Sequence, residues 1–331
     1  MFEGFAHVWT PVAMSSELRA DRPLALTVAG TPVVLFRARD GSPAALLDRC
    51  PHRGVALSLG KVKNGCVECP FHGWTLTPAG DVCHVPWNPD TKLDTLSGVS
   101  FPTVERAGQV WLYTATEAPS RSEPALHEAL TRVDVRVSGQ AVVWNTHWTR
   151  AMENMLDWPH LPFIHAGTIG RDMKRQGGAR MDIDWEPTPW GAHTRIQIDG
   201  VAQPGSLDFR WPNQMNLFIP LKGRTMIMQV ACVPIDATRT RMLLMMARDF
   251  LRPAMFDRVF NRSNLKIALE DQAVVESSYP PEIPPARDER SVRTDGPTLY
   301  FRKRYYAELR GSSVEARGRR ALPVVDAPAA G

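Results

Sequence analysis

Two short segments, CPHRG from Cys50 and CPFHGW from Cys69, each place a cysteine and a histidine close together. Cys50 and His52 are separated by one residue, Cys69 and His72 by two, and sixteen residues lie between His52 and Cys69. Short spacing within each pair lets one tight loop aim both side chains at one point. Two thiolates and two imidazoles suit zinc or a [2Fe–2S] cluster with histidine on one iron. The fold must therefore bring two loops together around a metal centre.

Composition places the chain among ordinary globular proteins. Its 331 residues suggest about two domains, and 44% of them are hydrophobic and 22% charged. The net charge of +4 is weak evidence for nucleic-acid binding. No secretory signal pattern is present, and the apolar runs are too short to cross a bilayer, so we expect a cytoplasmic protein with neither nucleic-acid nor membrane partners. In a reducing cytosol, five cysteines favour metal binding over disulfides.

The pattern of the chain predicts two domains of the α+β class. Residues 1–115 consist of short β-like runs broken by Gly, Pro and Asp, which predicts an all-β domain. Residues 116–125 are rich in Ser, Pro and charge and are predicted to be a linker, and 312–331 a disordered tail. Between them, in 126–311, we expect an antiparallel sheet from strands near 179–187, 192–200, 214–221, 225–234 and 240–250, with helices over 146–158, 252–278 and 297–309.

A second set of metal-binding residue types lies in the segment ENMLDWPHLPFIH, residues 153–165. His160 and His165 are five residues apart, with two prolines that bend the chain, so both rings can turn to one point. Two histidines and a carboxylate form the facial triad of non-haem Fe(II) oxygenases. The candidate carboxylates are Asp157 and Asp271. Asp271 lies within a predicted helix and is expected to be buried and to need a partner or a metal, because of its apolar neighbours Ile267, Ala268, Val274 and Val275.

These segments together resemble the α-subunits of Rieske non-haem iron oxygenases, most nearly the dicamba and vanillate O-demethylase type. CPHRG and CPFHGW resemble the Rieske motif, ENMLDWPHLPFIH the mononuclear iron signature, and EDQAVVE the segment with the third ligand. The resemblance implies a helix-grip-like catalytic domain and a homotrimer. It also implies roles for nine residues: cluster ligands Cys50, Cys69, His52 and His72; iron ligands His160, His165 and Asp271; Asn154 near the iron; and Asp157 as a bridge between His160 and His72 of the neighbouring subunit.

The resemblance further implies a terminal oxygenase that takes electrons from NAD(P)H through a ferredoxin or flavin reductase. The activity that the resemblance implies is monohydroxylation or oxidative O- or N-demethylation. Leu- and Met-rich strands could line an apolar pocket, so we expect an apolar or aromatic substrate. Dioxygenase or desaturase chemistry remains open. Exposed basic residues around the cluster loops are expected to steer an acidic ferredoxin: Arg49, Arg53, Lys61 and Lys63.

Three functions from other classes agree less well with the sequence. A Rieske electron carrier would need only about the first 115 residues. A zinc protein could use Cys50, Cys66, Cys69 and His72, since CVEC has the C-x₂-C spacing of zinc sites. The third is an oxygenase-like protein with an inactive iron site, which the presence of all three candidate ligands argues against. Where no role is implied, Cys66, Cys83 and Cys232 are expected to be small buried apolar residues.

Overall fold

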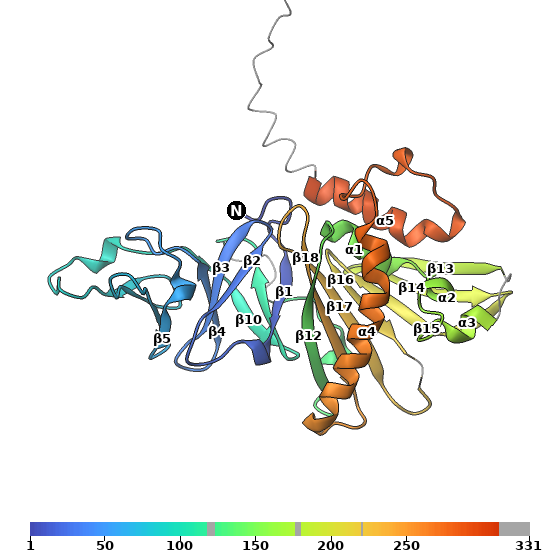
Figure 1. The fold of residues 1–331 in the computed structure, drawn as a ribbon, viewed down its shortest axis with the longest axis horizontal. Coiled ribbons are helices and arrows are strands. Elements are labelled where there is room, and N and C mark those ends of the chain that lie inside the picture. Colours follow the sequence, from blue (N-terminus) through green and yellow to red (C-terminus); the bar gives the residue numbers. More distant parts are fainter. Residues whose placement is uncertain (118–122, 176–179, 220, 311–331) are drawn as a thin grey trace, which may run out of the picture.

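The computed structural model describes residues 1–117, 123–175, 180–219 and 221–310. The predicted linker falls partly on residues 118–122 and the predicted tail on 311–331, so these parts of the two predictions lie outside the described residues. The remainder is α+β, with an N-terminal all-β region followed by a large antiparallel sheet crossed by a long helix (Figure 1). The predicted fold class is confirmed.

The N-terminal region consists of three antiparallel sheets, as the broken β-like runs predicted. The first sheet joins β1 (Trp9–Met14), β11 (Gln109–Tyr113) and β10 (Thr103–Arg106). The second joins β2 (Leu24–Val28), β3 (Thr31–Arg37), β4 (Pro43–Leu47) and β9 (Ser100–Phe101). The third, which lies at one end of the molecule, joins β5 (Lys61–Lys63), β6 (Cys66–Glu68), β7 (Thr75–Leu76) and β8 (Val82–His84) (Figure 1).

The second half is built on one seven-stranded antiparallel sheet with the order β12-β18-β17-β16-β15-β14-β13. The five strands predicted from the sequence correspond to β13 (Met181–Thr188), β14 (Gly191–Ile198), β16 (Gln214–Phe218), β17 (Met226–Pro234) and β18 (Thr240–Arg248). Two strands were not predicted: β12 (Arg136–Trp144) and β15 (Val201–Arg210).

Both missed strands contain residues that normally interrupt strands. In β12, a Cβ on Gly139 would lie 2.6 Å from the backbone oxygen of Leu244, so the close approach of β18 requires glycine there. In β15, Pro204 and Gly205 stand in the middle of the strand. The pairing of β14 with β15 shifts register between Arg195 and Gln197, opposite this segment. An irregularity of that kind is where proline and glycine are tolerated in a sheet.

Helices cover one face of the large sheet. The long helix α4 (Asp257–Glu276) contacts β12 and β18, and α1 (Trp148–Leu156) contacts β17 (Figure 1). Both are shorter than predicted, because a 3₁₀ turn at Ala254–Phe256 precedes α4, and α1 ends before Asp157, which is extended. The remaining helices are α2 (Leu161–Ile164), α3 (Arg171–Arg175) and α5 (Gly296–Arg304), and α5 continues as a π-helical turn over Tyr305–Arg310.

Each of the two predicted metal sites lies beside a buried apolar cluster. The larger cluster runs from the N-terminal strand β1 into the large sheet and its helices, and includes an edge-to-face contact between Phe5 and Trp148 at 5.2 Å. A second, smaller cluster lies between strands β3 and β4 and the sheet β5–β8, and contains Cys50 and Cys69. This sheet and helix α2 lie towards opposite ends of the molecule (Figure 1).

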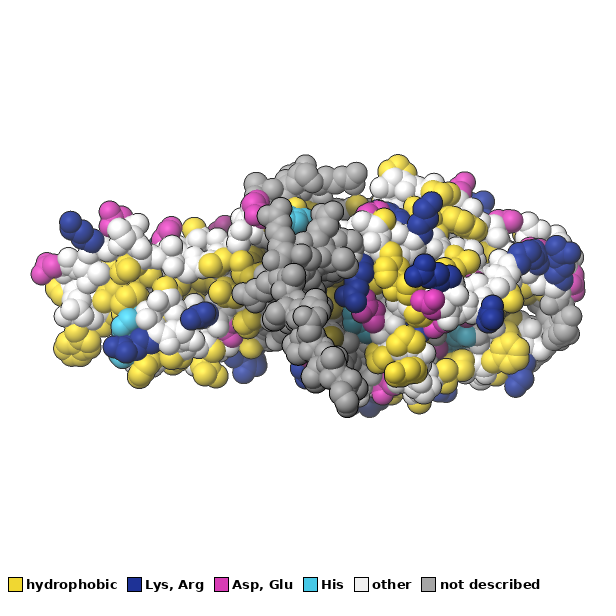
Figure 2. Space-filling model, turned by 90° about the horizontal axis from the view of Figure 1, so that it is seen from above, with side chains coloured by type: hydrophobic (Ala, Val, Ile, Leu, Met, Phe, Trp, Pro, Cys, Tyr) yellow, Lys and Arg dark blue, Asp and Glu magenta, His cyan; other side chains and the backbone are white. Residues whose placement is uncertain are grey.

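The surface shown in Figure 2 mixes basic, acidic and hydrophobic side chains, which agrees with the small net charge. Among the described residues, no helix is long and apolar enough to span a bilayer.

Candidate metal centres

His160, His165 and Asp271 come together as the sequence predicted. One ligand atom from each lies within 4.8 Å of the other two. The histidines flank the single turn of α2, and Asp271 reaches them from α4. Oδ1 of Asp271 is 3.1 Å from Nε2 of His165 and 3.6 Å from Nε2 of His160. The local structure around α2 thus positions the two imidazole rings, and the packing of α4 against it brings in the carboxylate of Asp271.

Asp271 is buried in a way that calls for a cation. The residue is 3% exposed, and its Oδ1 has no hydrogen-bond partner although two imidazole nitrogens face it. The buried face of α4 carries Ala268 and Val275, as expected, whereas Val274 turned out to be exposed. A buried carboxylate without a partner is costly, and two histidines with one carboxylate suit Fe(II). The trio therefore fits a mononuclear iron.

Each of the two histidines faces Asp271 with Nε2 and contacts a second carboxylate with Nδ1. Oδ2 of Asp157 lies 3.0 Å from Nδ1 of His160 and also accepts a hydrogen bond from its backbone N–H at 3.0 Å. Oε2 of Glu270 lies 2.8 Å from Nδ1 of His165. An ionised carboxylate only accepts, so each Nδ1 carries a proton, and each Nε2 is left to offer its lone pair to a metal beside Asp271. This is the form of histidine that binds a metal.

Glu270 was not identified from the sequence. Its only signal was its position next to Asp271, and its target depends on how α4 docks against α2. Burial acts to raise the pKa of Glu270, but hydrogen bonds from His165 and Thr168 outweigh it and hold the pKa below the usual range. Burial acts to lower the pKa of His165, and its contacts with Asp271 and Glu270 raise it overall.

A buried ion network fixes helix α1, which leads into this site. Glu153 forms ion pairs with Arg302 of α5 and with Arg150 one turn earlier, and both arginines also reach Glu289. Burial raises the pKa of Glu153 more than the two arginines lower it. The next residue, Asn154, lines the cavity beside the trio, and its buried Nδ2 has no partner. The network therefore anchors the segment from which Asn154 and Asp157 project.

An apolar cavity of about 50 Å³ adjoins the trio. His160, His165 and Asp271 line it at one side. Its sheet side comes from the Leu- and Met-rich strands, with Leu207, Met215, Met228, Met242 and Leu244 among the lining residues. Ligand pockets usually measure about 300–1,000 Å³. A substrate of ordinary size would therefore have to displace side chains, which flexible methionines allow.

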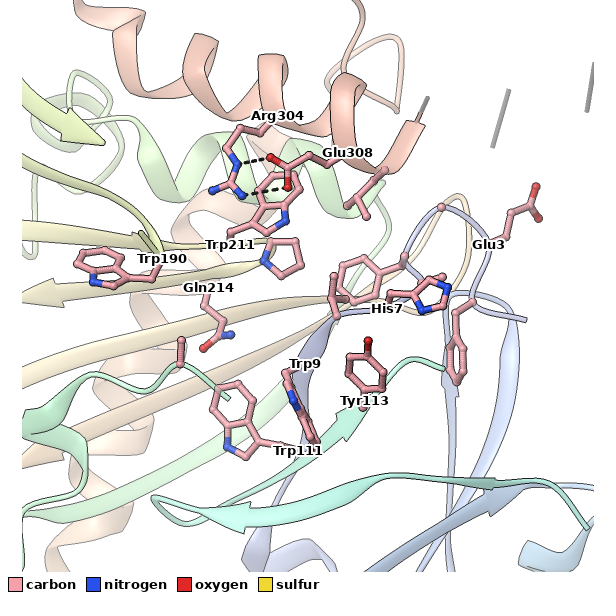
Figure 3. A pocket seen from close by; sticks show the side chains of 18 of the residues that line it. Glu3, His7, Trp9, Trp111, Tyr113, Trp190, Trp211, Gln214, Arg304 and Glu308 are labelled. Atoms are coloured by element: carbon pink, nitrogen blue, oxygen red, sulfur yellow. Dashed lines mark hydrogen bonds and ion pairs between the residues drawn. The ribbon is translucent and has the colours of Figure 1, made fainter. Parts of the chain in front are cut away.

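A larger cavity of about 960 Å³ lies between the N-terminal segment of residues 1–9 and the end of α5 with its π-helical turn, and none of the trio lines it (Figure 3). Its walls are aromatic, with Trp9, Trp111, Tyr113, Trp190 and Trp211, and Gln214 points into it. An ion pair between Arg304 and Glu308 at 2.7 Å stands at its edge. Glu123 and Leu309, near the undescribed segments 118–122 and 311–331, also line it. Size alone does not make this cavity the reaction site.

The two cysteine–histidine loops have the same backbone design. The N–H of Gly54 donates to the carbonyl of Cys50 at 2.9 Å, and the N–H of Gly73 donates to that of Cys69 at 3.0 Å. Both glycines have positive φ, +73° and +71°, which closes each loop tightly. In addition, the N–H groups of Cys50 and Cys69 donate to the carbonyls of Val55 and Trp74, each at 2.8 Å.

These loops separate the four predicted ligands into two pairs. Cys50 and Cys69 are buried, and burial raises the pKa of the Cys50 thiol. His52 and His72 are exposed, with their Nδ1 atoms 3.1 Å apart, and the ring of His52 stacks on Trp74 at 4.5 Å. Two thiols inside and two imidazoles outside fit a cluster in which one iron has cysteine ligands and the other histidine ligands.

The cysteines that were expected to be small buried residues behave differently from one another. Cys232 is buried, as expected. Cys83 is exposed, and its thiol donates to the carbonyl of Thr75 at 3.4 Å, because β8 is irregular at this position; the expectation was wrong for this residue. Cys66 is only partly buried, so the expectation was wrong for it as well; its thiol neighbours that of Cys83, whereas the thiol of Cys50 neighbours that of Cys69. The arrangement does not favour the zinc set that included Cys66.

Comparisons with known proteins agree on both halves of the chain. Residues 8–97 match the Rieske [2Fe-2S] domain family, and residues 199–309 match the vanillate O-demethylase oxygenase C-terminal domain family. Methylxanthine N1-demethylase NdmA of Pseudomonas putida is 28% identical over 91% of this chain and 88% of its own length. Dicamba O-demethylase of Stenotrophomonas maltophilia is 32% identical over 50% of this chain and 49% of its own length.

The chain spans less than half the length of the chlorophyllide a oxygenases that it also matches. For the Chlamydomonas reinhardtii protein the identity is 28%, over 82% of this chain and 43% of that protein. Among solved structures, Pseudomonas putida NdmA superposes with a TM-score of 0.76 at 25% identity, over 98% of this chain and 97% of that one. Dicamba monooxygenase bound to dicamba, with a TM-score of 0.71 at 20% identity over 95% and 98%, shares the fold.

Proposed function

We propose that the chain, which combines a Rieske [2Fe–2S] domain with a vanillate O-demethylase-type oxygenase C-terminal domain, is a terminal oxygenase. Its activity would be the O₂-dependent oxidation of an apolar or aromatic substrate by monohydroxylation or oxidative O- or N-demethylation. The observation that carries the proposal is the buried trio of His160, His165 and Asp271 at the side of an apolar cavity. A Rieske electron carrier would have no use for that trio.

We assign the cofactors to the two sets of residues described above. Cys50, Cys69, His52 and His72 would hold the [2Fe–2S] cluster in a domain of residues 1–115, and His160, His165 and Asp271 would hold Fe(II) in a domain of residues 126–311. When bound, the cluster supplies single electrons and the iron supplies open coordination positions for O₂. The Met and Leu side chains would bind the substrate and exclude water, and Asn154 would contact it near the iron.

Asp157 is the proposed bridge between two subunits. Its Oδ2 already accepts both hydrogen bonds from His160, and the side chain is 28% exposed, so a partner can reach it. Within one chain, the sheet that carries the cluster loops lies at the end of the molecule away from α2 (Figure 1). We therefore propose a homotrimer in which His72 of a second subunit donates to Asp157.

The proposed electron donor is a ferredoxin or flavin reductase that draws on NAD(P)H. Arg49 and Arg53 are exposed beside the Cys50 loop and would attract an acidic partner. Lys61 and Lys63 contribute less than expected, because both pair with Glu68, at 3.0 and 2.6 Å. Replacing the two arginines should slow reduction mainly at low salt.

Metal analysis tests the proposed function directly. Aerobically purified protein should contain about three irons and two acid-labile sulfides per chain, with the absorption of a Rieske cluster. Two irons that rise to about three after addition of Fe(II) would also support the proposal. Zinc without sulfide, persisting after anaerobic cluster reconstitution, would overturn it. Formaldehyde release from O- and N-methylated aromatic compounds, with a reductase supplied, would then separate demethylation from hydroxylation.

A further inference from the structure

We propose that Glu270 is a positioning residue for the mononuclear iron site: it fixes the ring and tautomer of His165 from the side opposite the metal. The proposal rests on the function proposed above. It is carried by one chain of contacts, in which Oε2 of Glu270 meets Nδ1 of His165 at 2.8 Å while Nε2 of the same ring faces Asp271 at 3.1 Å.

The carboxylate of Glu270 is itself held in place. The hydroxyl of Thr168 donates to the same Oε2 at 2.7 Å, and this threonine lies three residues after His165, in the turn that follows α2. The backbone N–H of Thr168 also donates to the carbonyl of His165 at 2.9 Å. The Glu270 side chain therefore contacts two residues of one turn, and His165 cannot rotate without breaking one of these contacts.

Helix α4 supplies both the metal-facing and the outer partner of His165. Asp271 and Glu270 are neighbours on α4, with side-chain exposures of 4% and 23%. The imidazole lies between them, one carboxylate at each nitrogen. A carboxylate on the outer nitrogen holds the proton there, leaves the inner nitrogen unprotonated, and makes the ligand more basic. His160 has the matching arrangement with Asp157, so both histidine ligands are set in the same way.

Metal affinity tests the inference without turnover. Protein with an intact Rieske cluster but no mononuclear iron is titrated anaerobically with Fe(II), and site occupancy is followed by the EPR signal of its nitric oxide adduct. Glu270→Leu should bind Fe(II) about 10- to 100-fold more weakly than wild type and give an altered EPR line shape. Glu270→Gln, which keeps an acceptor oxygen but loses the charge, should fall between the two. Thr168→Val should weaken binding less than Glu270→Leu.

Controls separate the possible outcomes. Glu276→Gln alters a carboxylate on the same helix that instead contacts Asn145 and Gln272, and should bind Fe(II) like wild type. The Rieske EPR signal reports folding of the N-terminal region in every variant, and the cooperativity of urea unfolding reports folding of the region that contains α4. If Glu270→Leu retains the signal and binds Fe(II) with wild-type affinity and line shape, the positioning role is wrong and the oxygenase proposal stands. If wild type itself binds no mononuclear iron, both fall.

Discussion

Asp157 accepts two hydrogen bonds from His160, one from the backbone N–H and one from Nδ1, and both distances are 3.0 Å. Because the ring and the backbone of one residue meet the same oxygen, the carboxylate fixes the imidazole rigidly. The other oxygen remains for the bridge that we propose.

Asp157→Asn should retain both metal centres and lose most turnover. The amide oxygen can still accept a hydrogen bond from His160, so the iron site should still fill at saturating Fe(II), but the negative charge between the two centres is gone. We expect about a 100-fold lower rate of cluster reoxidation by O₂ in the presence of substrate. Asp94→Asn, an exposed change on the N-terminal region, serves as control. Full activity in Asp157→Asn would eliminate the bridge.

His160→Ala and His72→Ala should each remove one centre and spare the other. The first should lower iron from about three to about two per chain, with the Rieske spectrum unchanged. The second should abolish the cluster spectrum while Fe(II) still binds at the mononuclear site. Each variant is the control for the other. Loss of both metal centres in either variant would contradict the assignment of His72 and His160 to two separate centres.

Met228→Phe should weaken substrate binding by about tenfold or more with iron content unchanged. Met228 is buried and lines the small cavity, and a rigid ring cannot adapt to a substrate as a thioether can. Met228→Leu preserves volume and is the matched control. The measurement is the KM for a substrate that the enzyme is found to oxidise in the test with methylated aromatic compounds. An unchanged KM in Met228→Phe would place the substrate elsewhere.

Stability should fall as pH drops from about 6.5 towards 4, in part because of His147. Burial lowers the pKa of this histidine to about 4 in the folded protein, from 6.5. The unfolded chain therefore takes up a proton before the folded one, which costs the folded state up to roughly 3 kcal/mol by pH 4. Above pH 6.5 this contribution is fully retained.

His147→Asn isolates that effect. His147 is the N-cap of α1 and accepts a hydrogen bond from the backbone N–H of Thr149, a role that asparagine fills without titrating. Urea unfolding at several pH values should show a shallower loss of stability with acid in the variant. If the free energy of unfolding of wild type and of His147→Asn fell with acid to the same extent, His147 would not contribute to the loss of stability.

The sequence predicted those parts of the sites that depend on local structure. The Cys50 and Cys69 loops are closed by their own glycines, and His160 and His165 sit on one turn. Asp271 could be inferred because a carboxylate among apolar helix neighbours needs a partner. Glu270 could not, because its target is 105 residues away and no periodicity marks it. Likewise, Pro204 and Gly205 make β15 resemble a loop in the sequence. Only the register shift in its pairing with β14 shows how a strand accommodates them.

The position of Asp271 and Glu270 on one helix couples metal binding to folding of the chain. The two histidines flank α2 and the two acids lie on α4, so a metal bound here would join segments about a third of the chain apart, as a cross-link would. By reciprocal linkage, any change that loosens α4 would weaken iron binding at the proposed site, and loss of that iron would make α4 less stable. The amount of iron that the protein retains during purification would then indicate the stability of the segment that contains α4.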